Sequence, residues 1–164
     1  RLVGSEMCIR DSRSSIGPTA TSAGSSPPHG GSSNQFRPEV WAVRVLAFED
    51  HYDIEAMLAA GGVNTDALVI EQRWNSTDAV ERIRAFAPDV LLLDHYMPPM
   101  NGHQVLEALL RSDVQRPSTV IAMSSASAKN DAMVRLGADQ GVVKFDLATL
   151  DVWRSPSLAS RETA

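Results

Sequence analysis

Apolar runs and amphipathic stretches alternate regularly from about Glu39 to Arg154, and this alternation restricts the fold more than any other feature of the sequence. Short apolar runs predict five β-strands, over residues 43–48, 67–72, 89–93, 118–123 and 141–143. A segment of helical periodicity follows each run, and the expected helices cover residues 51–60, 76–87, 102–112, 129–136 and 146–154. Ser76 or Thr77 is expected to cap the second helix.

This order of elements predicts a parallel sheet. Parallel neighbours need crossover connections, and the helices between the strands supply them. The run from Val90 to Leu93 is wholly apolar, as is typical of a strand covered on both faces. Proline and glycine stand at element ends, for example Pro88 and Gly137. The expected fold is therefore α/β, with three layers and a doubly wound five-stranded parallel sheet.

The first 38 residues differ in composition from the rest of the chain. Proline, glycine and serine make up 18 of these 38 positions, so the segment has too little apolar surface to offset its ordering entropy. We expect a disordered leader over residues 1–38, and its opening, RLVGSEMCIRDS, reads more like a read-through scar than a native segment. Residues 39–154 are expected to form one domain and residues 155–164 a disordered tail.

Charge and composition exclude several classes of function. The chain has 20 acidic and 15 basic residues and no cluster of Lys and Arg, which argues against direct nucleic-acid binding. No run approaches the roughly 18 apolar residues of a membrane span. The single cysteine, Cys8, excludes an internal disulfide and a cysteine-based zinc site. We expect a reducing compartment, hence the cytoplasm.

Polar residues end four of the five predicted strands. They are Glu49, Asp50, Asp94, Ser124 and Lys144. Ligands of open α/β sheets bind at the carboxyl ends of the strands, so these side chains are expected to converge. Each alone could be a helix cap, a turn residue or a surface lysine, but three converging carboxylates repel one another unless a cation such as Mg²⁺ neutralises them. A lysine and a hydroxyl beside them suit a phosphoryl group, with a carboxylate as nucleophile.

The motif Asp94-His95-Tyr96-Met97-Pro98-Pro99-Met100-Asn101-Gly102 resembles the phosphoacceptor aspartate and Met-Pro-x-Met-(Asp/Asn)-Gly turn of two-component response regulator receiver domains. The acidic pair Glu49-Asp50, the hydroxyl pair Ser124-Ser125 and the Leu136-Gly137-Ala138 step before Lys144 follow in the family's order and spacing. The resemblance covers about Ala42 to Arg154. It implies a flavodoxin-like sheet with strand order 2-1-3-4-5.

Site roles also follow from the resemblance. Asp94 would take a phosphoryl group from a sensor histidine kinase or histidine phosphotransfer protein, as a signalling phosphoacceptor rather than an enzyme. Asp50, Asp94 and the backbone carbonyl of Tyr96 would bind Mg²⁺, and Glu49 would contact the ion directly or through water. Ser124 and Lys144 would contact the phosphoryl group. The downstream effector is not identified by the sequence.

Two departures from the family pattern keep a second function open. Gly141 stands where the family usually has a Tyr or Phe that reports phosphorylation, so coupling to an output face is expected to be weak or to run by another route. Phe145 replaces a proline preceded by a cis bond, and a cis bond before a non-proline residue costs about 2.5–4 kcal/mol. We expect a trans bond or local strain there. Both departures favour a phosphorylation-independent interaction domain as the alternative.

Two further alternatives are less favoured. An aspartyl-phosphate phosphohydrolase needs a second aspartate two residues after its nucleophile, where this chain has Tyr96. A transition-metal site using His51, His95 or His103 is conceivable, but these histidines lack the i, i+4 spacing of a helical metal pair.

Overall fold

The computed structural model describes residues 42–154. The expected leader (1–38) and tail (155–164), together with Cys8, lie outside the described residues. Within the described part of the chain, no helix is long and apolar enough to cross a membrane.

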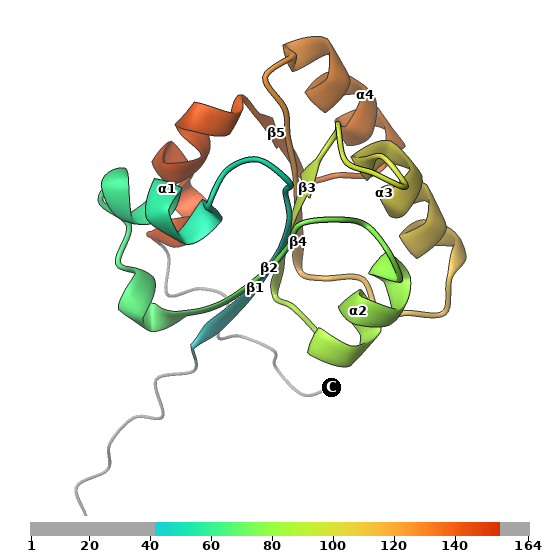
Figure 1. Ribbon diagram of the computed structural model, residues 1–164, viewed down its shortest axis with the longest axis horizontal. Helices are drawn as coiled ribbons and strands as arrows, with labels where there is room; N and C mark the ends of the chain where they lie inside the picture. Colours follow the sequence, from blue (N-terminus) through green and yellow to red (C-terminus); the bar gives the residue numbers. More distant parts are fainter. Residues whose placement is uncertain (1–41, 155–164) are drawn as a thin grey trace, which may run out of the picture. The chain divides into compact units, whose positions relative to one another are not determined.

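A five-stranded parallel sheet forms the centre of the fold (Figure 1). Its strands are β1 (Val43–Phe48), β2 (Leu68–Arg73), β3 (Val90–Asp94), β4 (Thr119–Met123) and β5 (Gln140–Val142). They are ordered β2-β1-β3-β4-β5, and every neighbouring pair is parallel. This arrangement confirms the predicted fold class and strand order.

In residues 42–154, four α-helices cover the two faces of the sheet. They are α1 (Ile54–Ala60), α2 (Ala79–Phe86), α3 (Gly102–Arg111) and α4 (Ser127–Leu136). Helix α1 lies on one face, and α2, α3 and α4 lie on the other (Figure 1). Three short 3₁₀ helices complete the described chain: η1 (Thr65–Ala67), η2 (Lys144–Thr149) and η3 (Asp151–Trp153).

The alternation of side chains along each strand builds two separate half-cores. In β1, Leu46 and Phe48 pack among residues of α2, α3 and α4, whereas Val45 and Ala47 pack with residues of α1 and η2. All five residues of the central strand β3 are buried, which explains why this run is apolar until its last residue. That last residue is Asp94, so the core positions a carboxylate at the edge of the sheet.

The expected C-terminal helix over residues 146–154 is wrong. The chain forms η2 and η3 there, separated by Leu150 in an extended conformation with ψ of 140°. Backbone hydrogen bonds in this segment join Leu150 N to Leu147 O and Trp153 N to Leu150 O, which is the three-residue spacing of a 3₁₀ turn. The turn places Leu147 in the core beside α1, so local packing outweighs helical periodicity.

The expected cap of the second helix is also wrong. Asp78, with φ of 53°, is the N-cap of α2, and Ser76 is buried two residues earlier. The Ser76 hydroxyl donates a hydrogen bond to Met100 O (2.7 Å) and accepts one from Met100 N (2.8 Å). Ser76 thus ties the β2–α2 loop to the loop after Asp94, a tertiary contact that replaces the expected cap.

Candidate functional site

Strand register brings the predicted site residues to one edge of the sheet. Phe48 pairs with Leu93, and Asp94 pairs with Met123. Glu49, Asp94 and Ser124 therefore stand at or just after the ends of three neighbouring strands. All three side chains are buried, with exposed fractions of 0%, 1% and 0%.

Lys144 reaches this edge from the end of the β5 segment and joins two carboxylates. Its Nζ lies 3.0 Å from Asp94 Oδ2 and 2.8 Å from Glu49 Oε2. Burial alone would lower the pKa of Lys144, but the hydrogen bonds to Glu49 and Asp94 outweigh it, and the pKa is raised. Lys144 is therefore protonated at neutral pH and offsets part of the buried negative charge.

Glu49 also organises the β1–α1 loop. Its Oε1 accepts hydrogen bonds from the backbone N–H groups of His51 (2.9 Å) and Tyr52 (3.1 Å). These bonds hold the loop turned toward Lys144 before α1 begins, which explains why α1 starts at Ile54 and not at His51. The N-cap of α1 is Asp53, whose side chain accepts from Ala56 N at 2.8 Å.

Asp50 has a different environment from Glu49. Its side chain is 16% exposed and contacts His51 Nδ1. Glu49, Asp50 and His51 each offer a ligand atom within 4.8 Å of the others. Asp94 is not a member of that cluster, so the structure does not bring all the predicted metal contacts within one such distance. The Tyr96 ring is exposed and packs edge-on against His95.

Ser124 follows β4 and is placed beside the Asp94 strand end without bonding to it. Its Oγ accepts from Ala126 N at 3.3 Å, and its backbone N–H donates to Val142 O at 3.3 Å. The structure therefore joins Glu49, Asp94 and Lys144 by direct contacts, and it places Ser124 at the neighbouring strand end.

The turn after Asp94 depends on a close backbone approach. A Cβ on Gly102 would lie 2.2 Å from Asp94 O, so only glycine fits at this position. Asn101 caps α3 in a reciprocal pair with Gln104. The motif glycine and asparagine thus fix how the loop leaves the aspartate.

The loops after Asp94 and after β5 differ in the conformation of their peptide bonds. Among the described residues the Pro98–Pro99 bond is cis, and the Lys144–Phe145 bond is trans. A trans bond was one of the two outcomes expected from Phe145, and it leaves Lys144 in contact with Asp94.

Gln72 is a site residue that the sequence analysis missed. Its Nε2 donates to Glu49 O (3.0 Å) and Tyr52 O (2.8 Å), and its Oε1 accepts from Ile54 N (2.9 Å). One side chain from β2 therefore holds the loop that carries the acidic pair. A polar residue near the end of an apolar run was the available signal.

Asn130 was missed in the same way. It lies in α4, is 3% exposed, and its Nδ2 donates to Val142 O (2.7 Å) and Ser124 O (3.3 Å). It anchors α4 across the ends of β4 and β5. Directly beneath it, a Cβ on Gly141 would lie 2.9 Å from Asn130 Cβ. The helix therefore packs directly onto β5 at Gly141.

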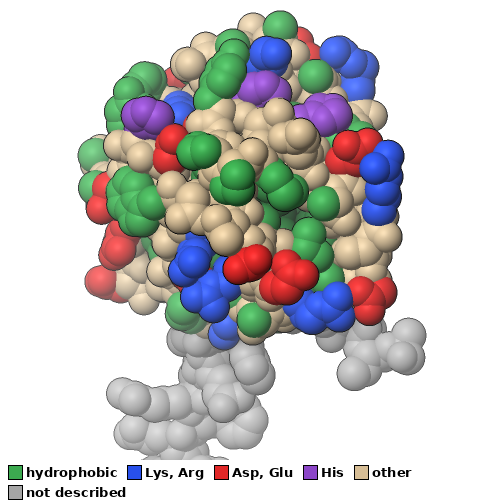
Figure 2. Space-filling model, turned by 45° about the vertical axis from the view of Figure 1, so that its right-hand side comes forward, with side chains coloured by type: hydrophobic (Ala, Val, Ile, Leu, Met, Phe, Trp, Pro, Cys, Tyr) green, Lys and Arg blue, Asp and Glu red, His purple; other side chains and the backbone are tan. Residues whose placement is uncertain are grey.

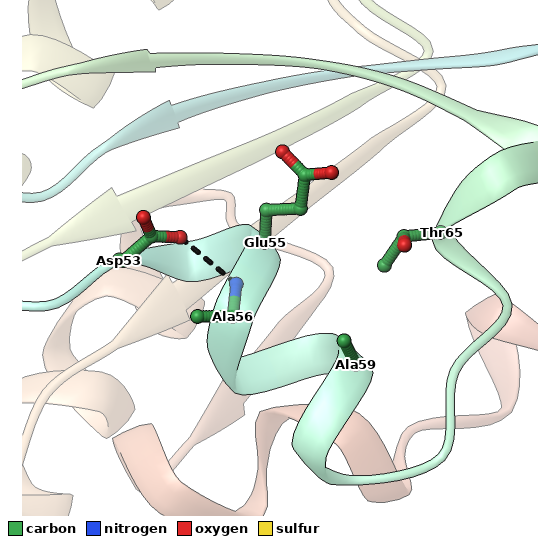
Figure 3. A pocket seen from close by; sticks show the side chains of 5 residues that line it. All are labelled: Asp53, Glu55, Ala56, Ala59 and Thr65. Carbon is green, nitrogen blue, oxygen red and sulfur yellow. Dashed lines mark hydrogen bonds between the residues drawn. The ribbon is translucent and has the colours of Figure 1, made fainter.

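The surface away from these strand ends is less distinctive. Figure 3 shows a shallow hollow along α1, lined by Asp53, Glu55, Ala56, Ala59 and Thr65. It contains none of the predicted site residues. On the face drawn in Figure 2, basic and acidic side chains are interspersed, as expected for a mixed, solvated surface.

Comparison with known proteins identifies the fold and the family. The response regulator receiver domain model matches residues 45–151. The chain belongs to this family. The receiver domain is 34% identical over 105 residues to the two-component response regulator ORR41 of Oryza sativa subsp. japonica. The match covers 59% of this chain and 79% of that protein.

A second relative is much longer than the matched region. The receiver domain is 32% identical over 120 residues to protein-glutamate methylesterase/protein-glutamine glutaminase 2 of Vibrio vulnificus (strain YJ016). The match covers 72% of this chain and 32% of that protein, so the chain spans about a third of this relative's length.

Solved structures agree on the fold. The signal receiver domain of the DNA binding response regulator merR from Colwellia psychrerythraea 34H matches with a TM-score of 0.52 and 25% identity, over 62% of this chain and 85% of that one. The response regulator domain of Thermotoga maritima CheB matches with a TM-score of 0.51 and 24% identity, over 69% and 86%.

Proposed function

We propose that this receiver domain accepts a phosphoryl group on Asp94, with Mg²⁺, from a phosphohistidine of a sensor histidine kinase or histidine phosphotransfer protein. The environment of the Asp94 carboxylate carries the proposal. Oδ2 lies 3.0 Å from Lys144 Nζ, whereas Oδ1 is buried without a hydrogen-bond partner among the described residues. An unpartnered buried oxygen is costly, and a role as nucleophile or ion ligand accounts for it.

The proposed reaction is an in-line transfer. An Asp94 oxygen forms a bond to phosphorus while the P–N bond of the phosphohistidine breaks, and the imidazole leaves with the electron pair. The product is an acyl phosphate. Lys144 would pair with a phosphoryl oxygen, and Ser124 at the neighbouring strand end would donate a hydrogen bond to another. The domain is modified once per cycle and is a phosphoacceptor rather than an enzyme.

The residues around Asp94 suit Mg²⁺. The ion prefers oxygen ligands and commonly takes one or two carboxylates, and the unpartnered Asp94 Oδ1 offers such a ligand. Asp50, Asp94 and the Tyr96 carbonyl would hold it, with Glu49 in contact directly or through water. When bound, the ion would neutralise charge on the phosphoryl oxygens. Lys144 supplies one positive charge against two buried carboxylates, which leaves negative charge for a cation to balance.

A phosphorylation-independent interaction domain is the second candidate. The packing of α4 on Gly141 favours it, because a larger side chain at that position would collide with Asn130. A receiver without a movable aromatic residue there could present a constant surface to its partner. The esterase and glutaminase activities in the names of the longer relatives are not part of either proposal.

Incubation with Mg²⁺ and a small phosphodonor, followed by intact-mass measurement, tests the proposal. We expect one phosphoryl adduct in the original protein and none in Asp94→Asn. Asp131→Asn, at an exposed position of α4, is the matched control and should keep the adduct. Absence of an adduct from the original protein with every donor would reject phosphoacceptance and favour the second candidate.

The proposal implies a class of partner, and the cysteine content gives the expected location. A phosphohistidine protein would be the donor, the effector is not identified, and the cytoplasm is the location expected from the cysteine content. Direct nucleic-acid binding is not proposed, because the chain is acidic overall.

A further inference from the structure

Two exposed aromatic side chains meet beside Lys144. Tyr52 lies in the β1–α1 loop, and Phe145 follows Lys144 in η2. Their ring centroids are 5.4 Å apart and their planes are inclined by 82°, an edge-to-face contact. The pair therefore bridges two loops that reach the site from different strands, β1 and β5.

Tyr52 also contacts the lysine that binds Asp94. Lys144 Nζ lies 5.3 Å from the centroid of the Tyr52 ring, within the range of a cation–π interaction. The ammonium thus has two carboxylates and an aromatic ring as neighbours. Among the described residues the Phe145 ring packs on Tyr52 and makes no cation–π contact with Lys144, so its aromatic contribution reaches the ammonium through the Tyr52 ring.

Both backbone polar groups of Tyr52 are held by hydrogen bonds. Its N–H donates to Glu49 Oε1 at 3.1 Å, and its carbonyl accepts from Gln72 Nε2 at 2.8 Å. The ring is consequently held by a loop that is tied to β2 and to the site itself. Phe145 packs edge-to-face with this ring and thereby limits its remaining rotation.

Phosphoryl transfer at this site needs the Lys144 ammonium to stay in one place. Lysine has a long side chain with many rotamers, and holding its ammonium in one place costs conformational entropy. During phosphoryl transfer the charge of the Asp94 carboxylate changes and Lys144 would turn toward a phosphoryl oxygen, so the contact with Asp94 cannot keep the ammonium in position. Glu49 and the Tyr52 ring do not react, so these two contacts can hold the ammonium throughout.

We infer that Tyr52 and Phe145 are positioning residues that hold the Lys144 ammonium at the phosphoacceptor, a role that rests on the proposed phosphoacceptor function. The contact between Phe145 and Tyr52 joins the loop after β5 to the loop after β1 and orders both. The residues act on Lys144 and do not contact the phosphoryl group themselves.

Side-chain NMR of Lys144 tests the placement without any phosphorylation. Ring currents should shift the Lys144 ε-methylene protons in the original protein and in Tyr52→Phe, which keeps the ring. The shift should be lost in Tyr52→Ala and reduced in Phe145→Ala. Trp74→Ala removes another exposed aromatic residue and serves as the matched control, with the Lys144 signals unchanged. Unchanged Lys144 signals in Tyr52→Ala would overturn the inference.

The rate of phosphorylation tests the consequence. A small phosphodonor is required, because exposed aromatic residues could also contribute to docking of a protein partner. We expect Tyr52→Ala to slow adduct formation roughly three- to tenfold, in the range of a cation–π contact. Tyr52→Phe should keep the original rate. The double variant Tyr52→Ala/Phe145→Ala should be no slower than Tyr52→Ala, because Phe145 acts through the ring.

The outcomes separate this inference from the function on which it rests. Equal rates in the original protein and Tyr52→Ala, with both proteins phosphorylated, would overturn the positioning role. An additive loss in the double variant would overturn the proposed route through Tyr52. Absence of any adduct in the original protein would reject the phosphoacceptor function, while the NMR measurement would still decide whether Tyr52 holds Lys144.

Discussion

Lys144 Nζ lies 3.0 Å from Asp94 Oδ2 at the carboxyl edge of the sheet, although 50 positions separate the two residues in the chain. Asp94 is 1% exposed and Lys144 is 8% exposed, so each charge depends on the other for compensation. Glu49 completes the cluster on the other side of the ammonium. The stability of the domain and its proposed chemistry therefore depend on the same contacts.

Replacing the lysine should destabilise the domain. Lys144→Met leaves two buried carboxylates without their cation, and we expect a loss of about 3–5 kcal/mol in the free energy of unfolding in Mg²⁺-free buffer. Urea unfolding at neutral pH measures this loss. Added Mg²⁺ should restore part of it, because the ion would neutralise the same carboxylates. Equal unfolding free energies for the two proteins in Mg²⁺-free buffer would contradict the expected role of the ion pair.

Removing the Gln72 side chain should weaken Mg²⁺ binding. Gln72→Ala removes the three hydrogen bonds that hold the loop of Glu49 and Asp50. We expect the dissociation constant for Mg²⁺ to rise roughly tenfold, as for other losses of indirect support at metal sites. Titration calorimetry measures it. Gln140→Ala, at an exposed position of β5, is the control and should bind Mg²⁺ like the original protein. The two variants would bind alike if Gln72 had no positioning role.

A single added methyl group should reveal how closely α4 packs on β5. Gly141→Ala places a Cβ 2.9 Å from Asn130 Cβ and 3.2 Å from Val134 Cγ2. We expect a loss of about 1–3 kcal/mol in the free energy of unfolding, the usual cost of overpacking. Val134→Ala in the same protein should relieve part of it. A gain of about 0.4–1 kcal/mol, typical of glycine replacement at an unconstrained position, would show that α4 moves aside without cost.

His95 should make the domain less stable in acid. Burial lowers the pKa of His95 and nearby Lys129 adds to the effect, while Asp94 opposes it. A histidine with a lowered pKa in the folded state binds its proton more readily when unfolded. Its contribution is therefore present above the ordinary histidine pKa of 6.5 and is lost as the pH falls through the lowered value.

His95→Asn isolates this effect. Urea unfolding of both proteins from about pH 7 to about pH 5 should show a smaller loss of stability in the variant, because asparagine does not titrate in this range. Parallel losses in the two proteins would mean that His95 takes up a proton equally well in the folded and unfolded states.

Much of the fold was predictable because parallel strands leave a strong local signal. Buried strands such as 90–94 are short, apolar and bounded by proline or polar residues, and the sequence places them within a few positions of the observed bounds. The C-terminal segment was not predictable in the same way. Its helical periodicity is real, but the contact of Leu147 with α1 favours two 3₁₀ turns.

The site also contains residues that the sequence predicts and residues that it does not. Residues that end apolar runs could be recognised singly, and the rule that parallel strands align their carboxyl ends brings Glu49, Asp94 and Ser124 together. Gln72 and Asn130 gave little signal, because their importance lies in hydrogen bonds to the backbone of distant segments. Such bonds depend on the geometry of the assembled fold.

Three features could be predicted without a structure: the α/β class, the parallel strand order implied by family resemblance, and the set of polar residues at the strand ends. These features follow from local periodicity and from motifs within a few residues of one another. The contacts between these groups became known from the folded molecule: Lys144 meets both Asp94 and Glu49, Tyr52 meets Phe145, and α4 meets Gly141. Such contacts join separate segments of the chain, and the packing of helices on the sheet sets their distances, so local patterns do not predict them.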